Sequence, residues 1–116
     1  MSSILIIDDD ARFRSQAQEL LEGDGFVVIG QAVDGAAGID AARSLHPDFV
    51  LLDIGLPDLD GFEVARSLAL DDPPALVVLT SSRDARAYGR RLQAVHVLGF
   101  IPKDQLSAAA IRALGT

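Results

Sequence analysis

The sequence contains no cysteine and no tryptophan among its 116 residues, and aromatic side chains make up only 5% of it. Without cysteine, neither a disulfide framework nor a thiolate metal site can form. No apolar run approaches the length of a membrane span, and residues 1–8 lack the pattern of a signal peptide. We therefore expect a cytoplasmic chain that does not contact a membrane.

Basic residues are also scarce, because 10 lysines and arginines stand against 17 acidic residues and give a formal net charge of -7. Non-specific nucleic-acid binding needs a basic surface that neutralises phosphates, so direct contact with nucleic acid is not expected. Apolar residues, in contrast, make up 49% of the chain, enough to bury the core of one domain. We expect a single domain over residues 1–116, with no output domain in this chain.

Short apolar runs alternate with helical patterns along the whole sequence. The predicted strands are continuous runs of β-preferring residues at 4–7, 26–29, 49–52, 76–79 and 97–101. Helical spacing of apolar residues predicts helices after Asp10, from Phe62 and around 106–114. An alanine-rich helix is predicted over 35–46 and a polar helix over 84–94. Five β–α units in series, (βα)5, predict an α/β fold with a parallel sheet covered by helices on both faces. The alternation leaves the strand order open.

Polar side chains follow four of the predicted strands. The first strand ends in Asp8, Asp9 and Asp10, the third in Asp53 and the fourth in Thr80 and Ser81, and Lys103 follows the fifth. In open parallel sheets, ligands bind beyond the carboxyl ends of the strands, near the point where the strand order reverses. A flavodoxin-like order would bring strands one, three, four and five together there, and these side chains would share one pocket.

These groups suit phosphoryl transfer to a carboxylate. Asp8, Asp9 and Asp53 would repel one another at close range, and a hard divalent cation such as Mg²⁺ or Mn²⁺ would relieve the repulsion. Lys103 offers a compact positive charge for an anionic phosphoryl group, and Thr80 offers a hydroxyl donor. A carboxylate in such surroundings can attack phosphorus and become an aspartyl phosphate.

Four segments resemble the defining segments of bacterial response-regulator receiver domains. They are ILIIDDD at 4–10, FVLLDIGLPDLDG at 49–61, VVLTS at 77–81 and FIPKD at 100–104. The segments occur in the family's order, and the resemblance covers essentially the whole chain. The resemblance implies a flavodoxin-like, doubly wound sheet with strand order 2-1-3-4-5. It also implies a phosphorylation-dependent switch of a two-component phosphorelay, a phosphoprotein that is not an enzyme in the ordinary sense.

The resemblance assigns roles to the acidic residues and their neighbours. Asp53 would be the phosphoacceptor and one ligand of Mg²⁺. Asp9 would ligate the metal directly, Asp8 mainly through water, and Gly55 through its backbone carbonyl. The phosphoryl donor would be a sensor histidine kinase or a phosphotransfer protein.

The resemblance also assigns the switch. Thr80 would be the switch hydroxyl, Lys103 the phosphoryl-binding lysine, and Phe100 the aromatic side chain that follows Thr80 inward on phosphorylation. The face made by the fourth predicted helix (84–94), the fifth strand (97–101) and the last helix (106–114) would then change and regulate a downstream protein or output domain. The same face would serve a possible homodimer.

The sequence departs from the family in the stretch that includes strand 5. Phe100 has no hydroxyl for a tyrosine-type hydrogen bond to a partner. Pro102 precedes Lys103, which removes the basis for expecting a cis peptide after the lysine. The stretch from Thr80 to Lys103 is about a residue longer than usual, which predicts an irregular fourth helix and loop. Gly89 lies inside that helix at a cost of about 1 kcal/mol relative to alanine, so helix 4 is predicted to be mobile.

Several other polar residues have simpler interpretations. Asp10 is predicted to cap a helix, and Asp58 and Asp60 are predicted to stabilise the turn in which they lie. His46 and His96 lack metal-ligand spacing and are predicted to be structural. A cluster of basic residues lies in or next to the helix predicted over 84–94. Its simpler interpretation is a solvated helix surface, and the alternative is a face beside Phe100 that docks a partner. The members of the cluster are Arg83, Arg86, Arg90 and Arg91.

Three other functions fit parts of the sequence. One is a receiver-shaped interaction module that does not use phosphate. Another is a phosphatase of the haloacid-dehalogenase type, in which Asp8 would be the nucleophile and Asp10 the general acid/base, although Asp53 would then have no role. A flavin site is disfavoured because the acidic first turn would repel a phosphate-bearing cofactor in the absence of a metal.

Overall fold

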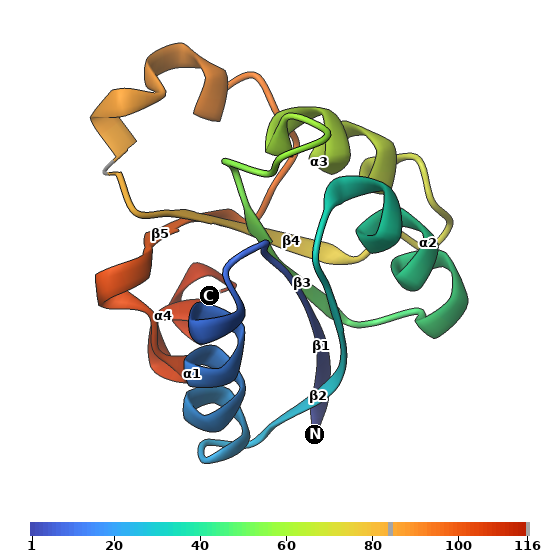
Figure 1. Ribbon diagram of the computed structural model, residues 1–116, viewed down its shortest axis with the longest axis vertical. Helices are drawn as coiled ribbons and strands as arrows, with labels where there is room; N and C mark the ends of the chain where they lie inside the picture. The colour runs from blue at the N-terminus through green and yellow to red at the C-terminus, as the bar shows by residue number, and fades with distance from the viewer. Residues whose placement is uncertain (84, 116) are drawn as a thin grey trace.

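The computed structural model describes residues 1–83 and 85–115, and its centre is a five-stranded parallel sheet (Figure 1). The strands are β1 (Ser2–Ile7), β2 (Phe26–Ala32), β3 (Phe49–Asp53), β4 (Leu76–Ser81) and β5 (Gly99–Pro102). Neighbouring strands are parallel throughout, in the order β2-β1-β3-β4-β5. The predicted flavodoxin-like order 2-1-3-4-5 is confirmed.

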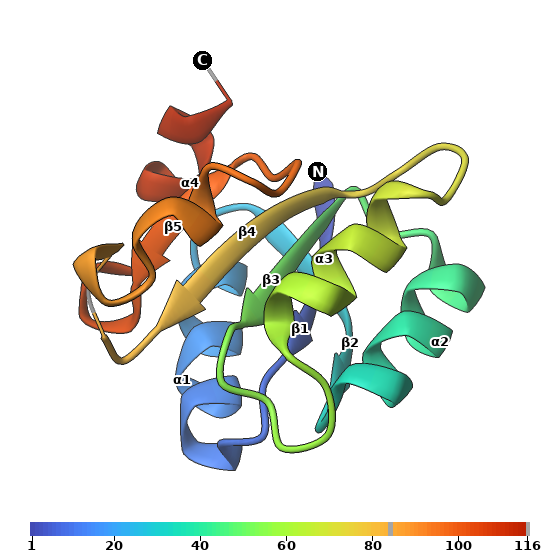
Figure 2. The same ribbon diagram turned by 90° about the horizontal axis from the view of Figure 1, so that it is seen from above.

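Helices cover both faces of the sheet (Figures 1 and 2). The helices α1 (Ala11–Glu22) and α4 (Ala108–Leu114) lie on one face, and α2 (Gly35–Leu45) and α3 (Gly61–Ala69) lie on the other. Side chains alternate between the two faces along a strand, so Ile4 and Ile6 of β1 belong to one apolar core and Leu5 and Ile7 to the other. Because both faces of β1 are buried, its sequence from Ile4 to Ile7 is apolar without interruption.

Acidic side chains fix where three of the helices begin. Asp10 accepts hydrogen bonds from backbone N–H groups in the first turn of α1, which confirms its predicted role as a cap. Asp34 and Asp60 cap α2 and α3 in the same way. Asp58 lies in the turn before α3, and its carboxylate accepts the N–H groups of Gly35 and Ala36 at the start of α2. The turn therefore also ties α3 to α2.

The predicted helix over 84–94 is wrong for the part of it that is described. Asp84, its predicted first residue, lies outside the described residues, and the chain from residue 85 forms two short 3-10 turns, η1 (Ala85–Ala87) and η2 (Gly89–Leu92). Tyr88 lies between them, and Gly89, the first residue of η2, has a φ of 52°, a left-handed conformation that interrupts an α-helix. The (βα)5 pattern thus lacks an α-helix between β4 and β5 within the described residues, in line with the irregularity predicted there.

The end of the chain differs slightly from the predicted boundaries. β5 begins at Gly99, two residues later than predicted, and runs one residue past Ile101, and a 3-10 turn, η3 (Lys103–Gln105), precedes α4. Leu106 therefore lies before the last helix rather than in it. Among the described residues the cis peptide bond is Asp72–Pro73 and not a bond after Lys103. No helix in the described part is both long and apolar enough to cross a membrane.

Candidate functional site

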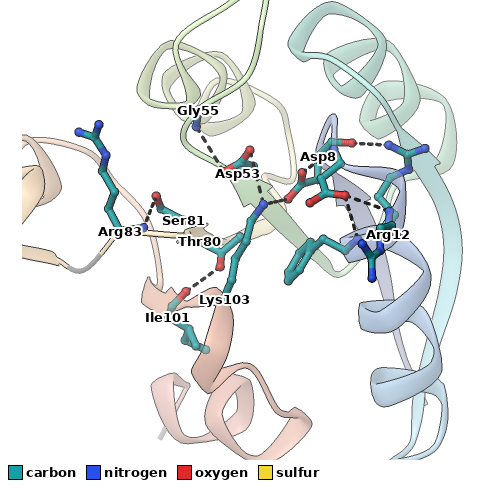
Figure 3. Close-up of polar contacts among 12 residues, drawn as sticks. Asp8, Arg12, Asp53, Gly55, Thr80, Ser81, Arg83, Ile101 and Lys103 are labelled. Carbon is teal, nitrogen blue, oxygen red and sulfur yellow. Dashed lines mark hydrogen bonds and ion pairs between the residues drawn. The ribbon is translucent and has the colours of Figure 1, made fainter.

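The carboxyl ends of β1, β3, β4 and β5 meet at one edge of the sheet and bring the predicted side chains together (Figure 3). The register of the parallel strands places Asp53 beside Thr80, and Thr80 beside Ile101. Asp8 and Thr80 are completely buried, and Asp53 is 6% exposed. Burying such polar groups lowers the stability of the fold unless they are paired with other polar groups, and unpaired ones are typical of functional sites.

Three carboxylates form a tight cluster at this edge. Asp8, Asp9 and Asp53 each offer one oxygen, and these oxygens lie within 4.8 Å of one another. The Oδ1 atom of Asp8 accepts the N–H of Asp10 at 2.9 Å, and Arg14 donates to the carbonyl oxygen of Asp8 at 2.7 Å. These contacts hold the end of β1 and the start of α1 in fixed positions around the acidic cluster.

Burial and repulsion act together on Asp53. Removal from water, followed by the nearby negative charge of Asp8, raises the pKa of Asp53 to about 6. Lys103 and the N–H of Gly55, which donates to Asp53 at 3.3 Å, act in the opposite direction but do not cancel the effect. The cluster therefore holds excess negative charge, which an added positive charge would stabilise.

The donor set fits a hard divalent cation. The Oδ2 atom of Asp8 is buried, and among the described residues it forms an ion pair with Lys103 but accepts no hydrogen bond. Carboxylate oxygens at this spacing are the ligands that Mg²⁺ and Mn²⁺ prefer. Asp9, Asp53 and Gly55 line an open pocket of about 610 Å³, which leaves room for water and a phosphoryl group.

Lys103 reaches across the pocket from the end of β5 (Figure 3). Its Nζ atom lies 2.8 Å from Oδ2 of Asp8 and 3.9 Å from Oδ2 of Asp53. The ammonium group also lies 4.4 Å from the centroid of the Phe13 ring, which supports it from the α1 side. The lysine thus places one positive charge between two of the three carboxylates.

Thr80 points away from the acidic cluster toward β5. Its hydroxyl donates to the carbonyl oxygen of Ile101 at 2.7 Å (Figure 3). Thr80 is the register partner of Asp53 on the neighbouring strand, whereas its hydroxyl bond lies on the other side of β4, toward β5. In this arrangement the hydroxyl is bound elsewhere and does not serve the pocket.

Tyr88 has no role predicted from the sequence, and Ser81 is predicted only to lie at the end of the fourth strand; both line the same pocket as Asp53. The Tyr88 ring lies between Phe62 of α3 and Phe100 of β5, with centroid distances of 5.9 and 6.0 Å. Its hydroxyl shares a hydrogen bond with the hydroxyl of Ser81, the residue after Thr80. The signal available in the sequence was slight, namely one tyrosine in a stretch of unusual length.

The predicted solvated arginine surface is only partly correct. Arg91 forms an ion pair with Asp60, the cap of α3, and its guanidinium lies 4.3 Å from the centroid of the Phe62 ring. Arg86 also has an interaction within the structure. The side chain of Arg83 extends away from the acidic cluster (Figure 3). The basic cluster is thus partly committed to contacts within the domain.

Comparison with known proteins points in the same direction as the geometry. Residues 4–114 match the response regulator receiver domain. A Pseudomonas aeruginosa protein whose name describes a transcriptional regulator is 41% identical over 104 residues, which are 89% of this chain and 50% of that protein. The DNA-binding response regulator MtrA of Mycolicibacterium paratuberculosis is 42% identical over 83 residues, 70% of this chain and 36% of that protein. The chain spans half or less of the length of these relatives.

A solved structure has the same fold over nearly the same length. The signal receiver domain of the response regulator NarL from Mycobacterium tuberculosis is 30% identical, with a TM-score of 0.86, and the match covers 97% of this chain and 92% of that chain. The sequence match, the strand order and the positions of the acidic and basic side chains thus agree with one another. The chain belongs to the response regulator receiver domain family of two-component systems.

Proposed function

We propose that this domain is a phosphorylation-dependent switch that accepts a phosphoryl group on Asp53 from the phosphohistidine of a histidine kinase or phosphotransfer protein. The observation that carries the proposal is the cluster of Asp8, Asp9 and Asp53, whose oxygens lie within 4.8 Å of one another beside Lys103. A purely structural strand end gains nothing from three crowded carboxylates, because their mutual repulsion lowers stability. A site for a cation and a phosphoryl group accounts for all of them.

Asp8, Asp9, Asp53 and the Gly55 carbonyl would hold Mg²⁺ or Mn²⁺, which supplies positive charge against the carboxylates and the incoming phosphoryl oxygens. Asp53 is the acceptor because it alone of the three ends the central strand β3 and lies beside Thr80. One of its carboxylate oxygens forms a bond to phosphorus while the P–N bond of phosphohistidine breaks. The bonding electron pair stays on the imidazole nitrogen, which takes up a proton.

Lys103 and Thr80 respond to the new charge. The ammonium group of Lys103, already 3.9 Å from Asp53, pairs with a phosphoryl oxygen. The Thr80 hydroxyl leaves the Ile101 carbonyl and donates to another phosphoryl oxygen. Phe100 then follows into the vacated space and changes the surface around β5, which regulates a partner or output domain. The transfer modifies the domain itself and is not turnover of a substrate.

The test is intact mass after incubation with acetyl phosphate or phosphoramidate, with and without Mg²⁺. We expect a metal-dependent phosphoryl adduct on the wild type and on the control Asp40→Asn, whose carboxylate is exposed on α2. We expect none on Asp53→Asn. Absence of an adduct on folded wild type with both donors would support a phosphate-independent interaction module. Retention of the adduct by Asp53→Asn would mean that another residue is the acceptor.

A further inference from the structure

Tyr88 joins three parts of the molecule that lie far apart in the sequence. Its ring packs against Phe62, which is 1% exposed in the core under α3, and against Phe100 of β5. Its hydroxyl reaches the buried Ser81 at the end of β4. A side chain that only filled an apolar gap would not need this hydroxyl, because phenylalanine has the same ring.

Ser81 connects that hydroxyl to the predicted switch. It follows Thr80 directly, and its Oγ atom also accepts the N–H of Arg83 at 3.1 Å (Figure 3). Its backbone lies opposite Pro102 in the β4–β5 register, next to the pair formed by Thr80 and Ile101. A displacement of the backbone at Thr80 would therefore also move Ser81, and the hydrogen bond would pass this movement to Tyr88.

We propose that Tyr88 is a positioning residue that couples Thr80 to the segment between β4 and β5 through its hydrogen bond with Ser81. The proposal deepens the proposed function and rests on it. The bond is formed in the arrangement in which Thr80 is bound to Ile101, so it stabilises the receiver before phosphorylation. When Thr80 turns to the phosphoryl group, Ser81 shifts, the bond breaks, and the Tyr88 ring leaves its place above Phe100.

The position of Tyr88 explains how the switch can work without a hydroxyl on β5. Phe100 cannot itself form a polar contact, and its ring lies against Tyr88. Inward movement of Phe100 would remove one of the two rings between which Tyr88 is held. A change at β5 and a change at Ser81 would therefore act on the same tyrosine, and the 3-10 turns on either side of it would move with it.

The chain provides its own reporter for this movement, because Tyr88 is the single tyrosine and there is no tryptophan. Intrinsic emission therefore comes from Tyr88. We expect beryllofluoride with Mg²⁺, a mimic of the phosphoryl group, to change the emission of the wild type and of the control Ser44→Ala, whose hydroxyl is exposed on α2. Ser81→Ala, which removes the hydrogen bond but keeps the tyrosine, should already emit like the beryllofluoride-bound wild type.

The kinetics of phosphorylation provide an independent readout. Ser81→Ala and Tyr88→Phe both remove the Ser81–Tyr88 hydrogen bond, and each should speed the reaction of Asp53 with acetyl phosphate about fivefold, the effect of one net hydrogen bond. Tyr88→Phe leaves the bond from the Arg83 N–H to Ser81 in place. The double variant should be no faster than either single variant, because the bond can be lost only once. Circular dichroism checks that each variant is folded.

The outcomes separate this inference from the function on which it rests. An adduct on Asp53 with unchanged tyrosine emission, or single variants that react at the wild-type rate or more slowly, would overturn the role of Tyr88 and leave the phosphorylation switch intact. Additive acceleration in the double variant would also overturn it, since the two hydroxyls would then act separately. Absence of any adduct on the wild type would overturn both.

Discussion

The two connections on either side of β4 differ in how firmly they are held. The connection before β4 contains α3, whose N-terminus is capped by Asp60 and which buries five residues: Gly61, Phe62, Val64, Ala65 and Leu68. The connection after β4 forms two 3-10 turns, and no side chain in its described residues 86–98 is fully buried. Tyr88 and Arg91 contact Phe62 and Asp60 at the start of α3, and partly buried apolar side chains of the connection pack against the same core.

The difference separates a fixed part of the receiver from an adaptable one. Burial of apolar surface is the main source of stability, so α3 and the end of β3 that carries Asp53 are held in place by the core. The connection after Thr80 buries little and can rearrange at low cost. A switch needs both properties, because the acceptor carboxylate must stay in position while the surface presented to a partner changes.

The largest expected effect tests the contrast directly. Phe62→Ala removes a side chain that is 1% exposed and leaves a cavity under α3, so we expect the free energy of unfolding to fall by about 3–5 kcal/mol. Tyr88→Ala removes a half-buried ring and should cost only about 1–2 kcal/mol. Urea unfolding followed by circular dichroism measures both. Equal losses would show that the connection after β4 is as firmly held as α3.

The second expected effect is a dependence of stability on pH that comes from Asp53, at the end of β3. Because burial and Asp8 raise the pKa of Asp53 to about 6, the folded state binds a proton there more tightly than the unfolded state, whose pKa is 3.8. Stability from this group is therefore complete below pH 3.8 and is lost as the pH rises through about 6. Without metal, Asp53→Asn should be more stable than the wild type at neutral pH by about 1–2 kcal/mol after allowance for solvent screening.

The measurement is urea unfolding across this pH range in the presence of a chelator. The advantage of Asp53→Asn should disappear in acid, where the wild-type carboxyl is protonated as well. Asp40→Asn, which changes an exposed carboxylate, should match the wild type at every pH. If Asp53→Asn were less stable than the wild type at neutral pH, the acidic cluster would not carry the repulsion inferred from its geometry.

The fixed part could be predicted from the sequence because two strong physical constraints act on it. Strands buried on both faces must be apolar throughout, so 4–7, 49–52 and 76–79 stood out as core strands. The carboxyl ends of parallel strands meet at one edge, so Asp8, Asp53 and Thr80 could be expected to lie together. The roles of these residues in phosphoryl transfer and metal binding stay predictions until the adduct is measured.

The adaptable part could not be predicted in the same way. Arg83, Arg86 and Arg90 follow helical spacing, which agrees with a polar α-helix over 84–94. Gly89 adopts a left-handed conformation that an α-helix does not allow, and the local pattern did not reveal this. The bond between Tyr88 and Ser81 and the pair of Arg91 with Asp60 join residues from different elements, and such contacts follow only from the tertiary structure.

The smallest expected effect concerns the contact that joins the two regions. Arg91 pairs with Asp60 and lies over the Phe62 ring, but 54% of its side chain is exposed. Arg91→Gln should therefore lower the free energy of unfolding by only about 0.5 kcal/mol, and salt should remove most of the difference. Amide hydrogen exchange over 89–94 should become about twofold faster, because this contact is one of those that break when the segment opens locally.

The matched control is Arg90→Gln, which removes the same charge from an exposed neighbour and so shares any long-range effect on this acidic protein. Partial burial alone would raise the pKa of Asp60, but the Phe62 N–H and Arg91 together lower it. The contribution of Asp60 is therefore present above pH 3.8 and is lost as the pH falls below that value, and the Arg91 effect should fade with it. If Arg90→Gln accelerated exchange as much as Arg91→Gln, the link between the two regions would be net charge and not this ion pair.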